Sequence, residues 1–300
     1  MNNNPTTRIQ AGRVTSRVLR LCCIVSLLLP FVSCSYNNSS NAGSNSTGGT
    51  PVSTRPVTWS DEFNQADGSP PDPTKWSFDT GGDGWGNEEL QTYTSRPQNV
   101  QVVGGNLAIT AIQEDYVGTD GILRNYTSAR IKTHHKFSQK YGRFEARIKL
   151  PTGVGVWPAF WIMGENVDTV PWPDCGEIDI MENIGNLPAT VYSTVHGPNA
   201  GGGAYRIGAT YNLPSGQFSD DFHVFAMEWS PNVLEFYVDG TLYSVVTPGT
   251  IPVDDTWVFD HPFFIVLNVA VGGVWSGPPN SSTVFPQTML VDYVRVYAPQ

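Results

Sequence analysis

Cysteine is scarce in most of this 300-residue chain. Three of its four cysteines, Cys22, Cys23 and Cys34, lie within the first 34 residues, which leaves only Cys175 for the rest. One cysteine cannot form an intrachain disulfide, so a disulfide framework is excluded for the body of the chain. Cys175 fits the role of a buried filling residue better than that of a nucleophile.

Charged residues are few as well, at 15% of the chain, where about 25% is usual. The net charge is −10, and the first 34 residues hold four arginines and no acidic residue. Without these arginines, 13 basic residues face 27 acidic ones, a balance of −14. Such a chain lacks the basic face that nucleic-acid phosphates require, so we expect no nucleic-acid partner. The low charge density fits a neutral substrate.

Long helical periodicity is also missing, since no stretch after residue 56 keeps a 3.6-residue apolar period over three turns. The chain instead contains 9 Trp, 12 Tyr, 14 Phe, 30 Gly and 23 Pro. So many aromatic residues exclude general disorder, and so much glycine and proline excludes a coiled coil or a long helical bundle. One large all-β domain fits the length.

The first 34 residues have the pattern of an export signal. Arginines precede an apolar run over Leu21–Val32, which is too short for a bilayer span of about 20 residues. Ser33 and Cys34 follow, and then a Ser/Asn/Gly/Thr-rich tract. This order resembles a bacterial lipoprotein signal cleaved before Cys34, with an ordinary signal peptide or a retained anchor as alternatives. We expect a lipid anchor at Cys34 and an exported protein at the outer surface, in the periplasm or secreted.

The body of the chain alternates polar and apolar residues with the period of a strand. Arg143–Leu150 alternates without a break, and His261–Val271 has the nearly all-apolar composition of a central strand. Asp239 and Gly240 separate two short strand patterns, as in a two-residue hairpin. We therefore expect a signal peptide over 1–34, a flexible linker over 35–56 and one domain over 57–298 built as a sandwich of two antiparallel sheets.

The segment Gly176–Glu182 holds three carboxylates, at Glu177, Asp179 and Glu182. On a helix they would share no face, and on a regular strand Glu182 would point into the core. A β-bulge at Met181 would return Glu182 to the face of the other two. Three adjacent carboxylates repel one another, which separates their pKa values and suits the ionised and protonated pair of a retaining glycosidase. A calcium site and a solvated polar face are the alternatives for this pattern.

Ten motifs in order resemble glycoside hydrolase family 16, in its laminarinase-like branch of endo-β-1,3-glucanases. The resemblance covers about residues 57–298. The motifs are Trp59–Phe63, Trp85–Gln91, Tyr126–Arg130, Tyr141–Arg147, Trp157–Trp161, Gly176–Glu182, His196–Pro198, Asp221–His223, Leu267–Gly273 and Val291–Tyr297.

The resemblance implies a concanavalin A-like β-jelly-roll with a concave substrate cleft. It also implies that Glu177 is the nucleophile, Glu182 the general acid/base and Asp179 their tuning partner. The residues that it places along the cleft are Asn87, Arg130, Trp157, Trp161, Trp172, His196 and Trp275. No catalytic cofactor is implied, and we expect a monomer.

A structural calcium on the convex side is a further implication of the resemblance. Its ligands would be Glu62, a backbone carbonyl near Gly105, and Asp292. A salt bridge is the alternative for Asp292.

The expected activity is endo-hydrolysis of β-1,3-glucosidic bonds in laminarin-type glucans. Three alternatives stay open at this point. They are a mixed-linkage β-1,3-1,4-glucanase, an agarase- or carrageenase-like enzyme, and a non-catalytic glucan-binding lectin of the same fold. The intact acidic triplet argues against the lectin, and the acidic body argues against sulfated substrates.

Overall fold

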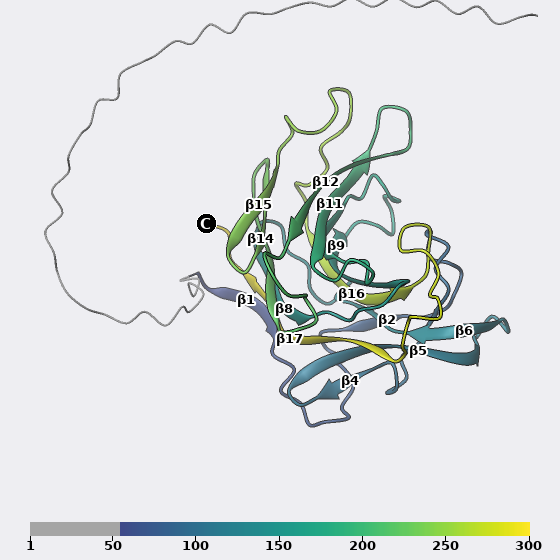
Figure 1. Ribbon diagram of the computed structural model, residues 1–300. Helices are drawn as coiled ribbons and strands as arrows, with labels where there is room; N and C mark the ends of the chain where they lie inside the picture. Colours follow the sequence, from purple (N-terminus) through teal and green to yellow (C-terminus); the bar gives the residue numbers. More distant parts are fainter. Residues whose placement is uncertain (1–54) are drawn as a thin grey trace, which may run out of the picture. The chain divides into compact units, whose positions relative to one another are not determined.

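The computed structural model describes residues 55–300 (Figure 1). The predicted signal peptide, the lipid anchor at Cys34 and nearly all of the linker lie outside these residues. Residues 55–300 contain no helix, and so no helix there could cross a membrane. Their strands are β1 Val57–Asp61, β2 Ser77–Asp79, β3 Thr92–Tyr93, β4 Val100–Val103, β5 Asn106–Val117, β6 Leu123–Ser128, β7 Arg130–Lys132, β8 Gly142–Lys149, β9 Val156–Gly164, β10 Glu177–Glu182, β11 Thr190–Pro198, β12 Ala204–Asn212, β13 His223–Ser230, β14 Val233–Val238, β15 Thr241–Val246, β16 Phe263–Val271 and β17 Gln287–Tyr297.

These strands form two sheets, as the alternation predicts. The ten-stranded sheet has the order β15-β14-β13-β8-β17-β5-β6-β3, with β1 on β17 and β4 on β5. The seven-stranded sheet has the order β12-β11-β10-β9-β16-β7-β2. All pairs are antiparallel except the short pair of β3 with β6. Figure 1 shows β9, β11, β12 and β16 on one side and β5, β8 and β17 on the other.

The predicted hairpin turn lies where the sequence places it. Asp239 and Gly240 connect β14 to β15, and both have positive φ, at 48° and 79°. This is the backbone conformation that a type I′ hairpin turn requires. Gly104 and Gly105 likewise connect β4 to β5, with φ of 58° and 74°.

The seven-stranded sheet has an apolar inner face and a functional outer face. On β16 every residue is buried, although Phe263, Ile265 and Leu267 belong to the main core and Phe264 and Val266 do not. The last two pack with Ala159 and Trp161 of β9 in a second, smaller cluster on the opposite face. The outer face of this sheet therefore carries its own small apolar cluster.

The predicted bulge lies in β10. Against β9, Asp179 pairs with Trp161 and Met181 with the adjacent Phe160, so Ile180 is the extra residue on that side. The register with β11 shifts over the same residues, between Asp179 and Glu182. Ile180 and Met181 are 1% and 0% exposed and both join the core. The bulge thus comprises Ile180 and Met181, and it lets the strand continue without placing Glu182 in the core.

Candidate active site

A cleft of about 440 Å³ lies on the outer face of the seven-stranded sheet. All ten residues expected at the cleft line it. They are Asn87, Arg130, Trp157, Trp161, Trp172, Glu177, Asp179, Glu182, His196 and Trp275. Residues up to 188 positions apart in the chain therefore line one cleft, because strands distant in sequence are neighbours in this sheet.

The three carboxyl groups of β10 lie along one side of the cleft and are poorly exposed to water. Asp179 and Glu182 are 4% and 8% exposed, and the Glu177 side chain is 19% exposed. Burial raises the pKa of Glu177 to about 7, and the neighbouring Asp179 charge adds to this effect. Burial also raises the pKa of Asp179 to about 7.

Glu182 holds its proton most strongly of the three. Burial raises its pKa well above the usual range, and the charges of Asp179 and Glu177 raise it further. Glu177 faces more positive charge, because His196 and Arg130 both lower its pKa. Glu177 is therefore the more easily ionised of the two glutamates and Glu182 the more strongly protonated, which is the division of roles that acid-base chemistry needs.

His196 on β11 connects two of the carboxyl groups. Its Nε2 lies 3.2 Å from Asp179 Oδ2 and 3.8 Å from Glu177 Oε1. These three groups are close enough together to hold a cation. The same proximity lets a protonated His196 stabilise the ionised forms of the carboxyl groups.

Aromatic side chains line the cleft around Glu182. The indole N–H of Trp157 donates a hydrogen bond of 3.0 Å to Glu182 Oε1. The Trp157 ring meets Trp275 edge to face at 5.1 Å, and Trp275 meets Tyr192 in the same way at 5.0 Å. This contact chain holds the indole of Trp157 in place to orient the acid.

Arg130 is fixed on the other side of the cleft. Its guanidinium lies between the rings of Trp85 and Trp161, at 4.9 Å and 4.7 Å from their centroids. Its Nε lies 3.0 Å from Asp79 Oδ2. Trp161 is only 8% exposed because Arg130 covers part of it, whereas Trp172 is 47% exposed. Trp172 therefore presents more free ring surface to a ligand than Trp161.

A sequence profile described as Glycosyl hydrolases family 16 matches residues 87–295. The chain belongs to this family. The match includes nearly every residue of the cleft and confirms the resemblance on which the predicted roles depend.

This glycosyl hydrolase is similar over most of its length to proteins with known activities. It is 45% identical over 251 residues to a beta-glucanase of Rhodothermus marinus, covering 80% of this chain and 84% of that protein. It is 40% identical to glucan endo-1,3-beta-glucosidase A1 of Niallia circulans, covering 81% of this chain and 38% of that longer protein. The catalytic domain of an endo-1,3-beta-glucanase (laminarinase) from Thermotoga petrophila superposes with a TM-score of 0.76 at 46% identity, covering 83% of this chain and all of that one.

Several cleft residues of this family 16 hydrolase were not singled out from the sequence. Asn268 of β16 accepts a 2.7 Å hydrogen bond from the Trp161 indole and donates one of 3.0 Å to the Tyr93 hydroxyl. Tyr93 in turn donates to Glu89 Oε2 at 3.2 Å, and Gln91 donates to the same oxygen at 2.6 Å. The signal for Asn268 is present in the sequence, since it is the one polar residue in the apolar run Phe263–Val271.

Trp85, the first residue of the motif Trp85–Gln91, and Arg206 also line the cleft, and Arg206 lacked a usable signal in the sequence. Arg206 comes from β12, where its guanidinium lies 5.7 Å from the Trp275 ring and lowers the pKa of Asp179. On the sequence it is one of several exposed polar residues in an alternating strand. Its place opposite the acidic triplet follows from the pairing of β12 with β11, which places Arg206 beside His196.

The two carboxylates expected to bind calcium have arginine partners in the structure. Both carboxylate oxygens of Glu62 accept hydrogen bonds from Arg295, at 2.9 Å and 2.7 Å, which lowers the pKa of Glu62. Arg147 donates a hydrogen bond of 2.7 Å to Asp292. Gly105 lies in the β4–β5 turn. A calcium ion would fit here only if both carboxylates exchanged their arginine partners for the ion.

Cys175 has the environment expected of a filling residue. It is fully buried and unpaired, and burial raises the pKa of its thiol to about 11. A thiol that stays protonated at neutral pH is a poor nucleophile.

Proposed function

We propose that this chain is a retaining endo-β-1,3-glucanase that hydrolyses laminarin-type glucans. The observation that carries the proposal is the arrangement of Glu177, Asp179 and Glu182 on one face of β10, made possible by the bulge at Ile180–Met181. The endo-1,3-beta-glucanase activities named for similar proteins support the linkage. The tryptophan-rich lining suits the stacking of neutral sugar rings.

In the first step, Glu182 transfers its proton to the glycosidic oxygen while ionised Glu177 attacks the anomeric carbon. The bond to the leaving sugar breaks and a covalent glycosyl-enzyme forms. In the second step, the Glu182 carboxylate takes a proton from water, whose oxygen attacks the same carbon and releases Glu177. Two inversions retain the configuration. The charge of Asp179 raises the pKa of Glu182 and so helps to keep the acid protonated.

The remaining lining residues suit sugar binding. Trp172 offers an exposed ring for stacking, and Trp157 and Trp275 form an aromatic wall near the acid. Asn87, Arg130 and His196 supply polar groups for sugar hydroxyls.

Replacing the nucleophile tests the mechanism directly. Glu177→Ala should hydrolyse an activated laminari-oligosaccharide at a rate lower by several orders of magnitude, and azide should restore turnover with a glycosyl azide of inverted configuration. Glu235→Ala, on β14 of the other sheet, serves as the matched control and should keep wild-type activity. An active Glu177→Ala without added nucleophile would contradict the proposal.

Substrate comparison separates the alternatives. Laminarin should be cleaved faster than lichenan or barley glucan, with a series of oligosaccharides as early products. Faster cleavage of the mixed-linkage glucans would favour a lichenase, and preferred cleavage of agarose or carrageenan would favour that activity. Binding without turnover would favour a lectin. Activity that survives EDTA would exclude an obligatory cation at Glu177, Asp179 and His196.

Calcium binding through Glu62, Gly105 and Asp292 would require both carboxylates to release Arg295 and Arg147 and bind the ion instead. If it occurs, added Ca²⁺ should raise the melting temperature, and Asp292→Asn should abolish that rise. An unchanged melting temperature would favour the ion pairs as the only role of these carboxylates.

We also propose that the protein is exported as a lipoprotein through Cys34 and acts as a monomer. The support is the sequence pattern of residues 1–34. Metabolic labelling with a fatty acid should mark the full-length chain but not Cys34→Ala, and sedimentation of the domain should give the mass of one chain.

A further inference from the structure

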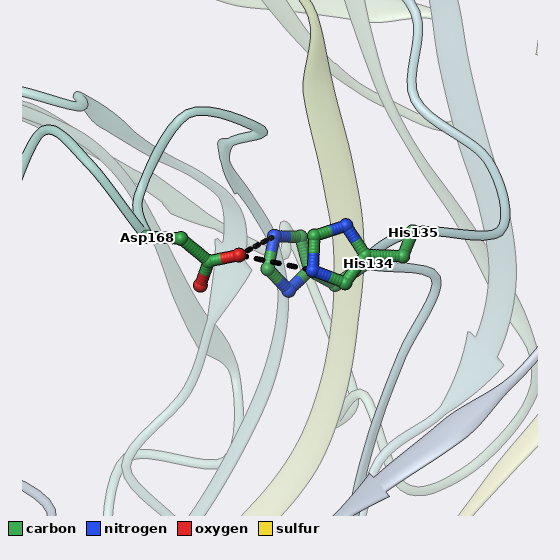
Figure 2. Close-up of side chains that lie close together, drawn as sticks. All are labelled: His134, His135 and Asp168. Atoms are coloured by element: carbon green, nitrogen blue, oxygen red, sulfur yellow. Dashed lines mark ion pairs between the residues drawn. The ribbon is translucent and has the colours of Figure 1, made fainter.

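Two loops bring together a second group of titratable side chains, which lies outside the cleft lining. His134 and His135 follow β7, whereas Glu165 and Asp168 follow β9. Figure 2 shows Asp168 facing both imidazole rings. None of these residues lines the catalytic cleft.

The Nε2 atoms of both imidazoles lie near one carboxylate oxygen, and His134 Nε2 also lies 3.4 Å from the backbone oxygen of Glu165. Asp168 Oδ2 lies 3.0 Å from His135 Nε2 and 3.8 Å from His134 Nε2. The rings stack, with their centroids 3.8 Å apart. All three ligand atoms lie within 4.8 Å of one another. For a tetrahedral ion with bonds of about 2.0 Å, neighbouring ligand atoms are separated by roughly 3.3 Å, so the ligand atoms are close enough once the stacked rings turn to direct both Nε2 lone pairs at one ion.

Glu165 orients His135 from its other side. Glu165 Oε1 lies 3.5 Å from His135 Nδ1 and also accepts a 3.1 Å hydrogen bond from the backbone N–H of His135. A histidine that binds a metal through one nitrogen usually donates its other N–H to a carboxylate or carbonyl. Glu165 Oε2 is buried without a hydrogen-bond partner among the described residues. A buried oxygen without a partner has a free-energy cost, so the position of this carboxylate beside the His135 ring calls for a further role.

The two histidines differ in exposure in a way that suits ion entry. The side chain of His134 is 6% exposed and its ring packs 4.4 Å from that of Phe264. The side chains of His135 and Asp168 are 67% and 60% exposed. One ligand is thus fixed against the apolar cluster of the sheet, and the other two are open to solvent.

We propose that His134 Nε2, His135 Nε2 and Asp168 Oδ2 bind a divalent transition-metal ion such as Zn²⁺, with water as the fourth ligand. Two imidazole nitrogens and one carboxylate oxygen favour Zn²⁺, Cu²⁺ or Ni²⁺ over Ca²⁺ or Mg²⁺, which prefer oxygen ligands. The ion would join the β7–β8 loop to the β9–β10 loop, and the latter also carries Trp172. Its role is a structural cross-link, separate from hydrolysis.

Zinc titration of the untagged domain, after EDTA treatment and its removal, tests the proposal. Calorimetry should find one Zn²⁺ bound by the wild type, and Zn²⁺ should raise the melting temperature. His135→Asn and Asp168→Asn should each weaken binding by about tenfold or more, and Glu165→Gln should also weaken it, by roughly 10- to 100-fold. Asparagine is chosen at 135 because that residue has φ of 61°, which asparagine tolerates.

Two controls keep the result specific. Asp254→Asn removes an exposed carboxylate elsewhere and should bind Zn²⁺ like the wild type. His196→Ala removes a ligand from the other possible cation group, at the catalytic carboxylates, and should leave the tight site intact. Binding that survives His135→Asn but is lost in His196→Ala would overturn the proposal. No zinc binding by the wild type would overturn it as well.

Discussion

Trp157 donates its indole N–H to Oε1 of Glu182 over 3.0 Å, and so the wall of the cleft and the proposed acid are directly connected. This bond favours the ionised form of Glu182 and lowers its pKa. It therefore opposes the burial that keeps the group protonated. The balance between the two effects sets the pH at which the acid loses its proton.

Trp157→Phe should shift that pH upward. The variant keeps an aromatic ring but loses the N–H, so the pKa of Glu182 rises further. Because Glu182 must be protonated to act, the basic limb of the kcat/KM profile should move to higher pH. The rate should fall roughly tenfold from the lost orientation. Trp275→Phe, which makes no hydrogen bond to Glu182, should leave the basic limb in place. A downward movement in Trp157→Phe would contradict the assignment.

Glu177→Gln should make the fold more stable at high pH. The pKa of Glu177 rises from 4.5 to about 7 on folding, so the protonated form is the one that folding favours. Its contribution is fully present below about pH 4.5 and is lost as the pH rises through about 7. At pH 8 the variant should gain on the order of 3 kcal/mol in the free energy of unfolding, and at pH 4 almost nothing. Urea titrations at the two pH values measure this, and equal gains at both would refute it.

Activity should fall on the acid side for the same reason. The nucleophile must be ionised, so kcat/KM should decline as the pH falls below about 7. His196→Gln removes a positive neighbour, which raises the pKa of Glu177 and should move the acid limb to higher pH. An acid limb that stays in place would mean that His196 does not act on Glu177 through its charge.

Arg130→Lys should reduce kcat/KM by about tenfold, because lysine cannot fill the space between Trp85 and Trp161 with a flat cation. Steady-state kinetics on laminari-oligosaccharides measures the loss. Arg295→Lys is a matched control, because Arg295 pairs with Glu62 on the ten-stranded sheet. Equal losses in both variants would indicate a general effect on the fold.

Met181→Ala should reduce both stability and activity. It removes a fully buried side chain from the bulge, at a cost of about 2–5 kcal/mol. Met289→Ala, also fully buried but on β17, should lose similar stability. Only the bulge variant should lose activity per folded molecule, since only Met181 positions Glu182. Chemical denaturation and active-site-normalised rates distinguish the two effects.

The alternation of polar and apolar residues predicted the sandwich. The bulge could be located because a regular strand would have buried the charge of Glu182 in the core. The ten cleft residues could be predicted together only through the family resemblance, since Trp172 and Trp275 lie outside the ten motifs. Arg206 could not be found this way, because its position depends on the register of β12 with β11, which local patterns do not reveal. Glu62 and Asp292 show the opposite problem. Their residue types suit a metal, yet their partners Arg295 and Arg147 are brought in by strand pairing.

The bulge in β10 also determines how this strand can be engineered. Before it, the odd-numbered residues Glu177 and Asp179 face the cleft. After it, the even-numbered Glu182 does, because Ile180 and Met181 both turn into the core. A library that randomises every second position along β10 would therefore start in the binding surface and continue in the hydrophobic interior. A library aimed at substrate preference should therefore randomise odd-numbered positions before Ile180 and even-numbered positions after Met181.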